Sequence, residues 1–274
     1  MTPLFSTGEI SVQEQPEAVR GALYEIYLFR GAARFSIDFV DYESAGPTAL
    51  FLTPYQTLSW HHAECDSLGR IRFHGDYYCI EYHREEVACN GVLFNDVYEV
   101  PFVNLDEASF AELLAIREKM ERNQDRADAS SEAVVRSYLQ VLLALCSRAK
   151  LAFLEDRAAL TIPRPEIAAF RDLLERHFLE ERAPAFYAAR LGISPRTLSR
   201  LLKVRFGKPP GAIIRERVVL EAKRLLHLTH RNIKEIAALL RFEDEFYFSR
   251  YFKKETGISP QYFREEVGIS RAAR

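Results

Sequence analysis

The chain has 274 residues, a length that accommodates two domains with cores of their own. Hydrophobic residues make up 48% and charged residues 28%, and no stretch approaches the roughly 20 unbroken apolar residues of a membrane span. Because the first 20 residues also lack the basic start and apolar run of a secretory signal, we expect a cytoplasmic protein without a membrane partner.

The net charge of −2 conceals two parts of opposite sign. Residues 163–274 hold 23 Lys and Arg against 14 Asp and Glu, a net charge of +9, whereas residues 1–162 hold 14 against 25, a net charge of −11. A basic part joined to an acidic remainder indicates that one part meets a polyanion and the other does not.

Residues 22–100 have the pattern of strands. The stretch FSIDFVDY, residues 35–42, alternates apolar and polar side chains and predicts one half-buried strand. Residues 22–29 and 77–83 are aromatic and β-branched runs, and Gly and Pro turn signals separate the runs. Several short strands at this spacing predict a small barrel or sandwich.

Residues 106–156 change to a helical period. Asp106 is a suitable cap for a first helix, and a second helix is predicted to begin near Ser131. The second helix presents an apolar stripe, and two interpretations stay open: the stripe packs on the barrel, or part of it pairs with a second copy of the chain. The stripe consists of Val135, Tyr138, Leu139, Leu142 and Leu145.

Residues 155–165 contain two prolines and no periodicity, which predicts a linker before an all-helical region. Caps and turn residues divide that region into helices. The predicted boundaries are Pro184 to Gly192, Ser194 with Pro195 at the first position, 211–228, Asn232 to Leu240, and Asp244 to Gly257.

The helical region repeats itself at a spacing of 50 residues. The stretch LSRLLKVRFGKPP, residues 198–210, aligns with FSRYFKKETGISP, residues 248–260, and both share a Ser-Arg pair, a Lys, a Gly and a Pro. A short helix, a tight turn and a basic second helix are typical of a helix-turn-helix unit, whose second helix lies in the major groove. The two units, over residues 184–206 and 232–256, would enter successive groove segments about 10 base pairs apart.

Residues predicted to contact DNA point outward from each second helix. Arg can bind guanine with two hydrogen bonds, Glu can accept from cytosine, an aromatic ring can touch a thymine methyl, and Lys suits phosphate. Surface Arg and Lys are often merely solvated, but two basic copies in register favour contacts for Arg200 and Arg250, while Ser199 and Ser249 stay open. The full set is Arg196, Thr197, Ser199, Arg200, Lys203, Glu245, Phe246, Ser249, Arg250, Lys253 and Lys254.

Residues 165–266 resemble the AraC/XylS family of bacterial transcription regulators. The resemblance rests on LGISPRTLSRLLK, RERVVLEAKRLL, IKEIAALL and FYFSRYFKKETGISPQYFR. It implies two helix-turn-helix units joined by a linking helix, here with Arg217 and Ala222, and the same reading residues. The chain departs from the family at Arg241, where Gly is usual at a turn that often needs positive φ, and at Phe246, where a small polar residue is common.

The N-terminal half resembles more weakly the cupin-like sensor domain of such regulators, over residues 23–60. The resemblance implies a barrel that binds a small effector, helices that form a homodimer through the apolar stripe, and RNA polymerase as a partner of an activator. Expected pocket residues are Tyr27, Phe39, Phe51, Trp60 and Tyr78, and for each of them the alternative is that it only fills the barrel.

These observations predict an α+β fold: an N-terminal cupin-like β-barrel with two following helices, then an all-α domain with two helix-turn-helix units joined by a linking helix. The expected domains are a barrel over 1–105, a helical dimerisation segment over 106–154, a linker over 155–164, a DNA-binding domain over 165–266 and a tail over 267–274.

The leading hypothesis is a sequence-specific, effector-responsive transcription regulator that binds double-stranded DNA at the nucleoid, without a cofactor. The alternatives are enzymes: a cupin-type metalloenzyme fused to a DNA-binding domain, or an alkylation-repair protein with a four-cysteine zinc site. Both need metal ligands. The cupin pattern H-x-H is absent, with His61 and His62 adjacent and His74 and His83 scattered. The cysteines lack a C-x-x-C pair, so we expect buried free thiols at Cys65, Cys79, Cys89 and Cys146.

Overall fold

The computed structural model describes residues 3–12, 19–38, 40–65, 67–78, 91–94, 96–126, 128–159 and 164–267. The chain divides into two compact units. Unit 1 is Met1–Asp96 with Val100–Leu160, and unit 2 is Val97–Glu99 with Thr161–Arg274. Each unit has its own buried core.

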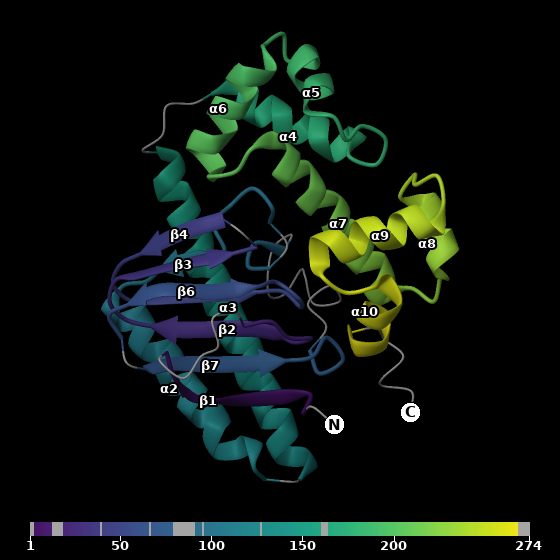
Figure 1. Ribbon diagram of the computed structural model, residues 1–274. Helices are drawn as coiled ribbons and strands as arrows, with labels where there is room; N and C mark the ends of the chain where they lie inside the picture. The colour runs from purple at the N-terminus through teal and green to yellow at the C-terminus, as the bar shows by residue number, and fades with distance from the viewer. Residues whose placement is uncertain are drawn as a thin grey trace. The chain divides into compact units, whose positions relative to one another are not determined.

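Unit 1 contains two antiparallel sheets (Figure 1). The five-stranded sheet has the order β1-β7-β2-β5-β8 and the three-stranded sheet has the order β4-β3-β6. The strands are β1 (Phe5–Ser11), β2 (Tyr24–Phe29), β3 (Ala33–Ile37), β4 (Val40–Ser44), β5 (Thr48–Leu52), β6 (Leu58–Ala63), β7 (Ser67–Phe73) and β8 (Phe102–Asn104).

Side chains alternate between the two faces of the five-stranded sheet, and each face packs into a core of its own. On one face, Phe51 and Ile71 pack in a cluster with side chains of α2 (Glu107–Gln124) and α3 (Ala129–Ala159), the two helices that cover this face in Figure 1. On the other face, Tyr27 and Leu50 pack in a second cluster with side chains of the three-stranded sheet. Because both faces are covered, β2 is buried at all six positions, as expected for a strand between two layers.

The prediction of one strand over residues 35–42 is wrong. The stretch forms a hairpin, with β3 ending at Ile37 and β4 beginning at Val40. Asp38 has a φ of 47°, in the left-handed region that Asp tolerates better than most residues. Its side chain accepts a hydrogen bond from the Thr57 amide at 2.9 Å, which holds the turn against the neighbouring loop. The strand predicted over 77–83 lies outside the described residues from Cys79 onward.

The first helix of unit 1 begins after its predicted cap Asp106, and the second begins at Ala129, two residues before the predicted start near Ser131. The Asp106 side chain accepts from the Ser109 amide at 2.7 Å, and Asp128 accepts from the Ser131 amide at 2.8 Å. The α3 helix extends to Ala159, so the first five residues of the predicted linker continue the helix. These residues, Glu155–Ala159, include the strong helix formers Glu, Arg and Ala, which explains the continuation.

Part of α3, Ser130–Asp156, is long and apolar enough to cross a membrane by length and composition, with a hydropathy of 1.3. The same segment is the main core helix of unit 1. Leu139, Leu142 and Cys146 are each 0% exposed and pack in the cluster shared with the five-stranded sheet. Packing within unit 1 therefore accounts for part of the apolar content of α3, since 33% of the apolar window is buried.

Unit 2 is helical in its C-terminal part, as predicted. Its helices are α4 (Pro165–His177), α5 (Pro184–Arg190), α6 (Pro195–Phe206), α7 (Pro210–Leu228), α8 (Ile233–Leu239), α9 (Glu245–Thr256) and α10 (Pro260–Val267). Figure 1 shows α7 running between the pair α5–α6 and the pair α8–α9. The predicted fold class, an α+β chain with two helix-turn-helix units joined by a helix, is confirmed, while the cupin-like assignment of the barrel stays a prediction.

The turn of the second helix-turn-helix unit carries backbone strain. Gly192 ends the first turn with a φ of 67°, and Arg241 occupies the corresponding position of the second turn with a φ of 57°. A side chain in the left-handed region costs about 1 kcal/mol, a cost that glycine avoids. The departure noted in the sequence is therefore accommodated by strain, without a change of turn.

Replacing Arg241 with glycine is expected to stabilise unit 2 by about 0.5–1 kcal/mol, because relief of the strain outweighs the greater freedom of an unfolded glycine. Urea unfolding followed by circular dichroism measures the change. The control is Gly192→Ala at the matching turn, which we expect to destabilise by a similar amount. A loss of stability in Arg241→Gly would contradict the account of the turn.

Candidate nucleic-acid interface

The first helix-turn-helix unit consists of α5 and α6 around a buried apolar seam. Tyr187 and Ala188 on α5 and Leu198 and Leu202 on α6 are at most 1% exposed. The Ser194 hydroxyl accepts from the Thr197 amide at 3.1 Å and caps the helix, and Pro195 occupies the first helical position. The seam fixes which face of α6 points away from the core.

That outward face of α6 carries the predicted cations. Arg196, Arg200 and Lys203 are exposed, whereas Thr197 and Ser199 are half-buried. The Thr197 hydroxyl lies 2.9 Å from the Ser194 hydroxyl, so it takes part in the cap. Of the five predicted residues, the three cations are the most exposed.

The second unit repeats this arrangement with α8 and α9. Phe248 and Phe252 are 0% exposed and hold α9 to the core. Asn232 and Glu235 form a capping box at the start of α8, and Asp244 accepts from the Tyr247 amide at 2.6 Å at the start of α9. Both reading helices end in a left-handed glycine, Gly207 and Gly257, as the repeat predicts.

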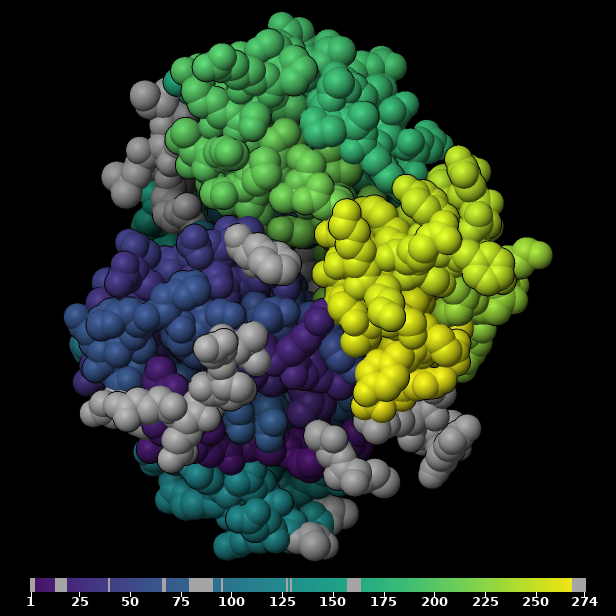
Figure 2. Space-filling model, viewed as in Figure 1, coloured from purple at the N-terminus to yellow at the C-terminus, as the bar shows by residue number. Residues whose placement is uncertain are grey.

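The outward face of α9 is basic and aromatic. Arg250, Lys253 and Lys254 are exposed, Phe246 is 70% exposed, and Glu245 and Ser249 are half-buried. In the described part of the chain, neither Arg200 nor Arg250 forms an ion pair, so their positive charge is left for an external anion. Figure 2 shows the surface of this C-terminal segment in yellow.

The linking helix α7 contacts both helix-turn-helix units and is held in place by a network of salt bridges. Arg217 donates to Glu175 of α4 at 2.9 Å, lies 4.0 Å from the Phe178 ring and pairs with Glu221 at 3.5 Å. Burial opposes ionisation of Glu221, but the charge and hydrogen bonds of Arg224 and Arg217 hold its pKa below the ordinary value. The predicted Arg217 therefore positions α7 and does not face a ligand.

A residue that the sequence analysis missed joins the two helix-turn-helix units. Arg182, before α5, lies 3.8 Å from the Phe242 ring and donates to the Leu240 carbonyl at 2.7 Å, both at the turn after α8. Burial lowers the pKa of this guanidinium. No local motif marks Arg182, because its partners lie some 60 residues along the chain. The contact fixes the first helix-turn-helix unit against the second.

Tyr247 was also missed. It is 44% exposed beside Phe246 at the start of α9, and its ring packs at 5.7 Å from Phe242. Its place at the first turn of a reading helix adds a second aromatic ring to the candidate interface. The aromatic pair in the sequence was a sufficient signal, but periodicity alone could not decide which ring points outward.

Comparisons with known proteins agree with this geometry. A model of a helix-turn-helix domain matches residues 187–266, which include both turn motifs and the linking helix. The chain is 31% identical over 146 residues to the HTH-type transcriptional activator RhaS of Salmonella schwarzengrund (strain CVM19633), covering 53% of this chain and 51% of the relative. Residues 187–266 are therefore similar to the helix-turn-helix domains of transcription regulators.

Two solved structures show lower sequence identity to this chain. ToxT from Vibrio cholerae is 14% identical, covers 97% of this chain and 99% of its own, and has a TM-score of 0.41. The C-terminal domain of AraT, a response regulator from Geobacillus stearothermophilus, is 29% identical, covers 40% of this chain and 91% of its own, and has a TM-score of 0.37. The chain spans about half the length of the curated relatives it matches.

The five residues that family resemblance suggested for an effector pocket do not share one space. Tyr27 and Trp60 pack in the cluster between the two sheets, with rings 6.2 Å apart. Phe51 and Tyr78 belong to the cluster beneath α2 and α3, on the opposite face of the sheet. Phe39 lies outside the described residues. A pocket between the sheets can therefore use Tyr27 and Trp60 but not Phe51 and Tyr78.

Of the residues predicted for a dimer seam, three are buried and two are half-buried. Val135, Leu139 and Leu142 are at most 2% exposed inside the core of unit 1 and are unavailable to a partner. Tyr138 and Leu145 are half-buried at the edge of that core. The sequence stripe is thus mainly the side of α3 that packs on the sheet, the first of the two interpretations.

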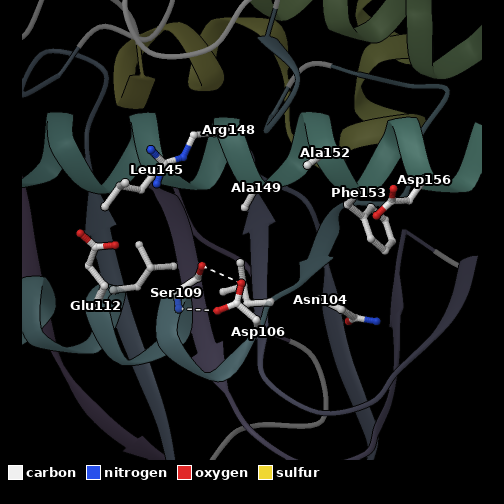
Figure 3. A pocket seen from close by; sticks show the side chains of 12 residues that line it. Asn104, Asp106, Ser109, Glu112, Leu145, Arg148, Ala149, Ala152, Phe153 and Asp156 are labelled. Atoms are coloured by element: carbon white, nitrogen blue, oxygen red, sulfur yellow. Dashed lines mark hydrogen bonds between the residues drawn. The ribbon is translucent and has the colours of Figure 1, made fainter.

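A groove between α2 and α3 lies in unit 1 (Figure 3). It has a volume of about 340 Å³. Figure 3 shows Leu145, Arg148 and Ala149 of α3 above Ser109 of α2 and Asp106, the residue that caps α2. The hydrogen bonds of the Asp106 cap form its floor, and they hold the pKa of that carboxyl below its usual value. The groove leaves part of the α3 surface open to a partner.

Metal-ligating side chains do not gather in the described part of the chain, where no group of three or more His, Cys, Asp or Glu could hold an ion. His61 and His62 are exposed on β6, and His74 is buried next to Asp76 at 3.4 Å. Cys146 is a buried free thiol, as predicted, and burial raises its pKa, while Cys65 is half-buried. His83, Cys79 and Cys89 lie outside the described residues.

Proposed function

We propose that this chain is a sequence-specific, effector-responsive transcription regulator that reads two successive major-groove segments of double-stranded DNA. The observation that carries the proposal is the repeated helix-turn-helix unit on one core, with Arg200 and Arg250 exposed and unneutralised at matching positions of α6 and α9. Relatives that match about half of the chain are named transcriptional activators, which supports the same function.

The proposed contacts divide by chemistry. Arg196, Arg200 and Arg250 can bind guanine through paired hydrogen bonds, and Phe246 can contact a thymine methyl. The lysines near the end of each helix, Lys203 among them, bind phosphates and fix the register without reading sequence. Thr197, Ser199, Glu245 and Ser249 contribute as smaller polar contacts at the groove edge.

Selection from a random pool of DNA duplexes, with the full-length protein at moderate salt, tests the proposal. The expected result is a site with two conserved blocks about 10 base pairs apart. Salt-sensitive binding without any sequence preference would overturn the claim of specific reading. One conserved block would show that a single unit reads, and the two-segment mechanism would be wrong.

The remaining parts of the proposal follow from DNA binding. We infer that the chain has no catalytic activity, needs no cofactor, is cytoplasmic and associated with the nucleoid, and contacts RNA polymerase if it activates. The metalloenzyme alternative gains no support, since the histidines of the described residues are dispersed over exposed and buried positions. Stoichiometric metal in the purified protein would favour that alternative.

We further propose a homodimer, formed by the outward side of α3 and not by the buried stripe. Val134 and Val141, seven residues apart, are 41% and 47% exposed, and Leu151 is 37% exposed on the same helix. A seven-residue spacing places apolar side chains on one seam of a helix pair. Leu145 and Arg148 line the groove between α2 and α3, and Tyr138 is half-buried on the same helix.

Replacing Val141 with glutamate is expected to weaken the dimer at least tenfold, because the seam would then bury a carboxylate without a partner. Sedimentation equilibrium of the full chain measures the dissociation constant. Val204→Glu is the matched control, since Val204 is 83% exposed on α6 of unit 2 and should not alter association. A monomeric wild-type protein, or a Val141→Glu dimer of unchanged affinity, would contradict the proposed seam.

A further inference from the structure

Three residues that precede β8 along the chain belong to unit 2. Val97, Tyr98 and Glu99 pack within unit 2, whereas Asp96 before them and Val100 after them are part of unit 1. The sequence analysis placed all three in the barrel, because the partners of Tyr98 and Glu99 lie 77 and 106 residues along the chain. We call Val97, Tyr98 and Glu99 the strap.

The Glu99 carboxylate of the strap holds the C-terminal end of the first reading helix. Arg205 of α6 donates to this carboxylate through both terminal nitrogens, at 2.8 and 3.3 Å, and Arg171 of α4 lies 4.0 Å away. Glu99 is 8% exposed. A paired contact between a guanidinium and a carboxylate fixes both distance and orientation, and removing one charge of a buried pair leaves the other uncompensated. The Glu99 carboxylate is therefore suited to hold α6 in one orientation.

Tyr98 adds contacts with the helices around α6. Its hydroxyl donates to Glu175 of α4 at 2.6 Å, and the same carboxylate accepts from Arg217 of α7 at 2.9 Å. The Tyr98 ring lies 6.0 Å from the Phe206 ring at the end of α6, and the Arg171 guanidinium lies over it at 4.6 Å. Burial, and then the hydrogen bond and charge of Glu175, raise the pKa of Tyr98, so its hydroxyl stays protonated and donates. The strap thus links α6 to α4 and α7.

The internal repeat places a matching ion pair on the second reading helix. Glu255 of α9 stands 50 residues after Arg205 and pairs with Arg215 of α7 at 3.3 Å, with the two charges exchanged. Each reading helix is therefore held by an ion pair at the same position near its end. The second reading helix has its partner on the linking helix, whereas the first has its partner on the strap.

Arg205 is poorly placed for a contact with DNA. Its side chain is 19% exposed and both terminal nitrogens donate to Glu99, whereas Arg200 and Lys203 are exposed. At 3.6 residues per turn, Arg205 lies about 140° around the helix from Arg200. The ion pair with Glu99 therefore acts on DNA reading through the position of α6.

We propose that Tyr98 and Glu99 are positioning residues of the first reading helix, which hold α6 against α4 and α7 in the orientation that reads DNA. The inference rests on the proposed function and assigns part of it to a segment outside residues 165–266. The chain on both sides of the strap belongs to unit 1. Reading by the first helix-turn-helix unit thus depends on residues from the N-terminal half of the chain, whereas reading by the second does not.

Glu99→Gln and Glu255→Gln, each in the full chain, form a matched pair for the test. Their affinities are measured on the selected DNA site and on two duplexes that each have one conserved block scrambled. The block read by α6 is the one at which Arg200→Ala loses discrimination. Scrambling that block should weaken binding of wild type at least tenfold but of Glu99→Gln less than threefold, while both keep their dependence on the other block. Glu255→Gln should show the reverse. Full dependence on both blocks in Glu99→Gln, or loss of both, would overturn the proposal.

Arg205→Gln tests whether Glu99 acts through α6. Both single variants should lose reading of the same block. The double variant should bind the selected site within twofold of the weaker single variant, because both changes break one contact. Losses that multiply in the double variant would show that the two residues act separately, and positioning through Arg205 would be wrong. Tyr98→Phe keeps the ring and removes only the hydroxyl, so it should give a smaller loss at the same block.

Hydrogen exchange of backbone amides in the full chain gives a second readout that needs no DNA. Glu99→Gln should speed exchange at least fivefold in α6 and leave α9 within twofold of wild type, because only α6 loses its ion pair. Equal acceleration in both helices would indicate general destabilisation and contradict the positioning role.

The two readouts separate this inference from the proposed function. If wild type selects no DNA site but α6 alone exchanges faster in Glu99→Gln, the proposed function fails and the strap still positions α6. If a two-block DNA site emerges while Glu99→Gln changes neither reading nor exchange, the inference about the strap fails and the proposed function stands.

Discussion

Replacing both Arg200 and Arg250 with alanine is expected to weaken binding to the selected DNA site by roughly 2–6 kcal/mol. Each paired contact to guanine contributes about 1–3 kcal/mol, and contributions add when the sites are far apart. The two arginines lie on different reading helices, α6 and α9, so they meet this condition. Neither forms an ion pair with another described residue, so the substitutions remove no such ion pair from the fold.

The measurement is a set of binding isotherms for the two single variants and the double variant, on the selected site and on sites altered at one position. Each single variant should lose discrimination at one position only, and the lost positions should lie in different blocks. Lys254→Ala is the control, because a phosphate contact should weaken all sequences alike and lower the salt slope by about one. Wild-type affinity in the double variant would show that the reading helices have been assigned wrongly.

The helix-turn-helix units could be predicted from the sequence because their signals are local. The caps Ser194, Asn232 and Asp244 lie within three residues of the amides that they bind, and the glycine ends follow directly from the left-handed turn. The repeat then placed Arg200 over Arg250 without any knowledge of the fold. Their exposure agrees with that reading, while the contacts with DNA stay a prediction.

Unit 1 was harder to predict, because strand pairing decides which face of the sheet each side chain occupies. Tyr27 and Phe51 have similar aromatic neighbourhoods in the sequence, yet the register of β2 and β5 sends them to opposite cores. The alternation over residues 35–42 fits one strand as well as a hairpin, so it could not reveal the turn at Asp38. The stripe on α3 was identified correctly as apolar, but only the packed structure shows that the sheet covers most of it.

The role of Arg182 could not be predicted from the sequence, because its contacts exist only in the tertiary structure. Its replacement by alanine is expected to have the second large effect. The guanidinium stacks on Phe242 and donates to the Leu240 carbonyl, and the two contacts together should contribute about 2 kcal/mol in this partly buried place. Urea unfolding of the full chain should show a loss of that size. Arg190→Ala is the matched control, since Arg190 lies 5.2 Å from the Phe186 ring within α5 alone and should cost less than about 0.5 kcal/mol.

The consequence for DNA reading follows from where the Arg182 contacts end. Both partners lie at the turn between α8 and α9, while Arg182 itself precedes α5, so the contact sets the angle between the two reading helices. On sites with 9, 10 and 11 base pairs between the conserved blocks, wild type and Arg190→Ala should prefer one spacing, since each extra base pair turns the groove by about 36°. Arg182→Ala should bind all three within about threefold, because the linking helix α7 alone then sets the angle. If the preference for one spacing survives in Arg182→Ala, the rigidity must reside in α7 and its ion pairs with Glu175 and Glu221.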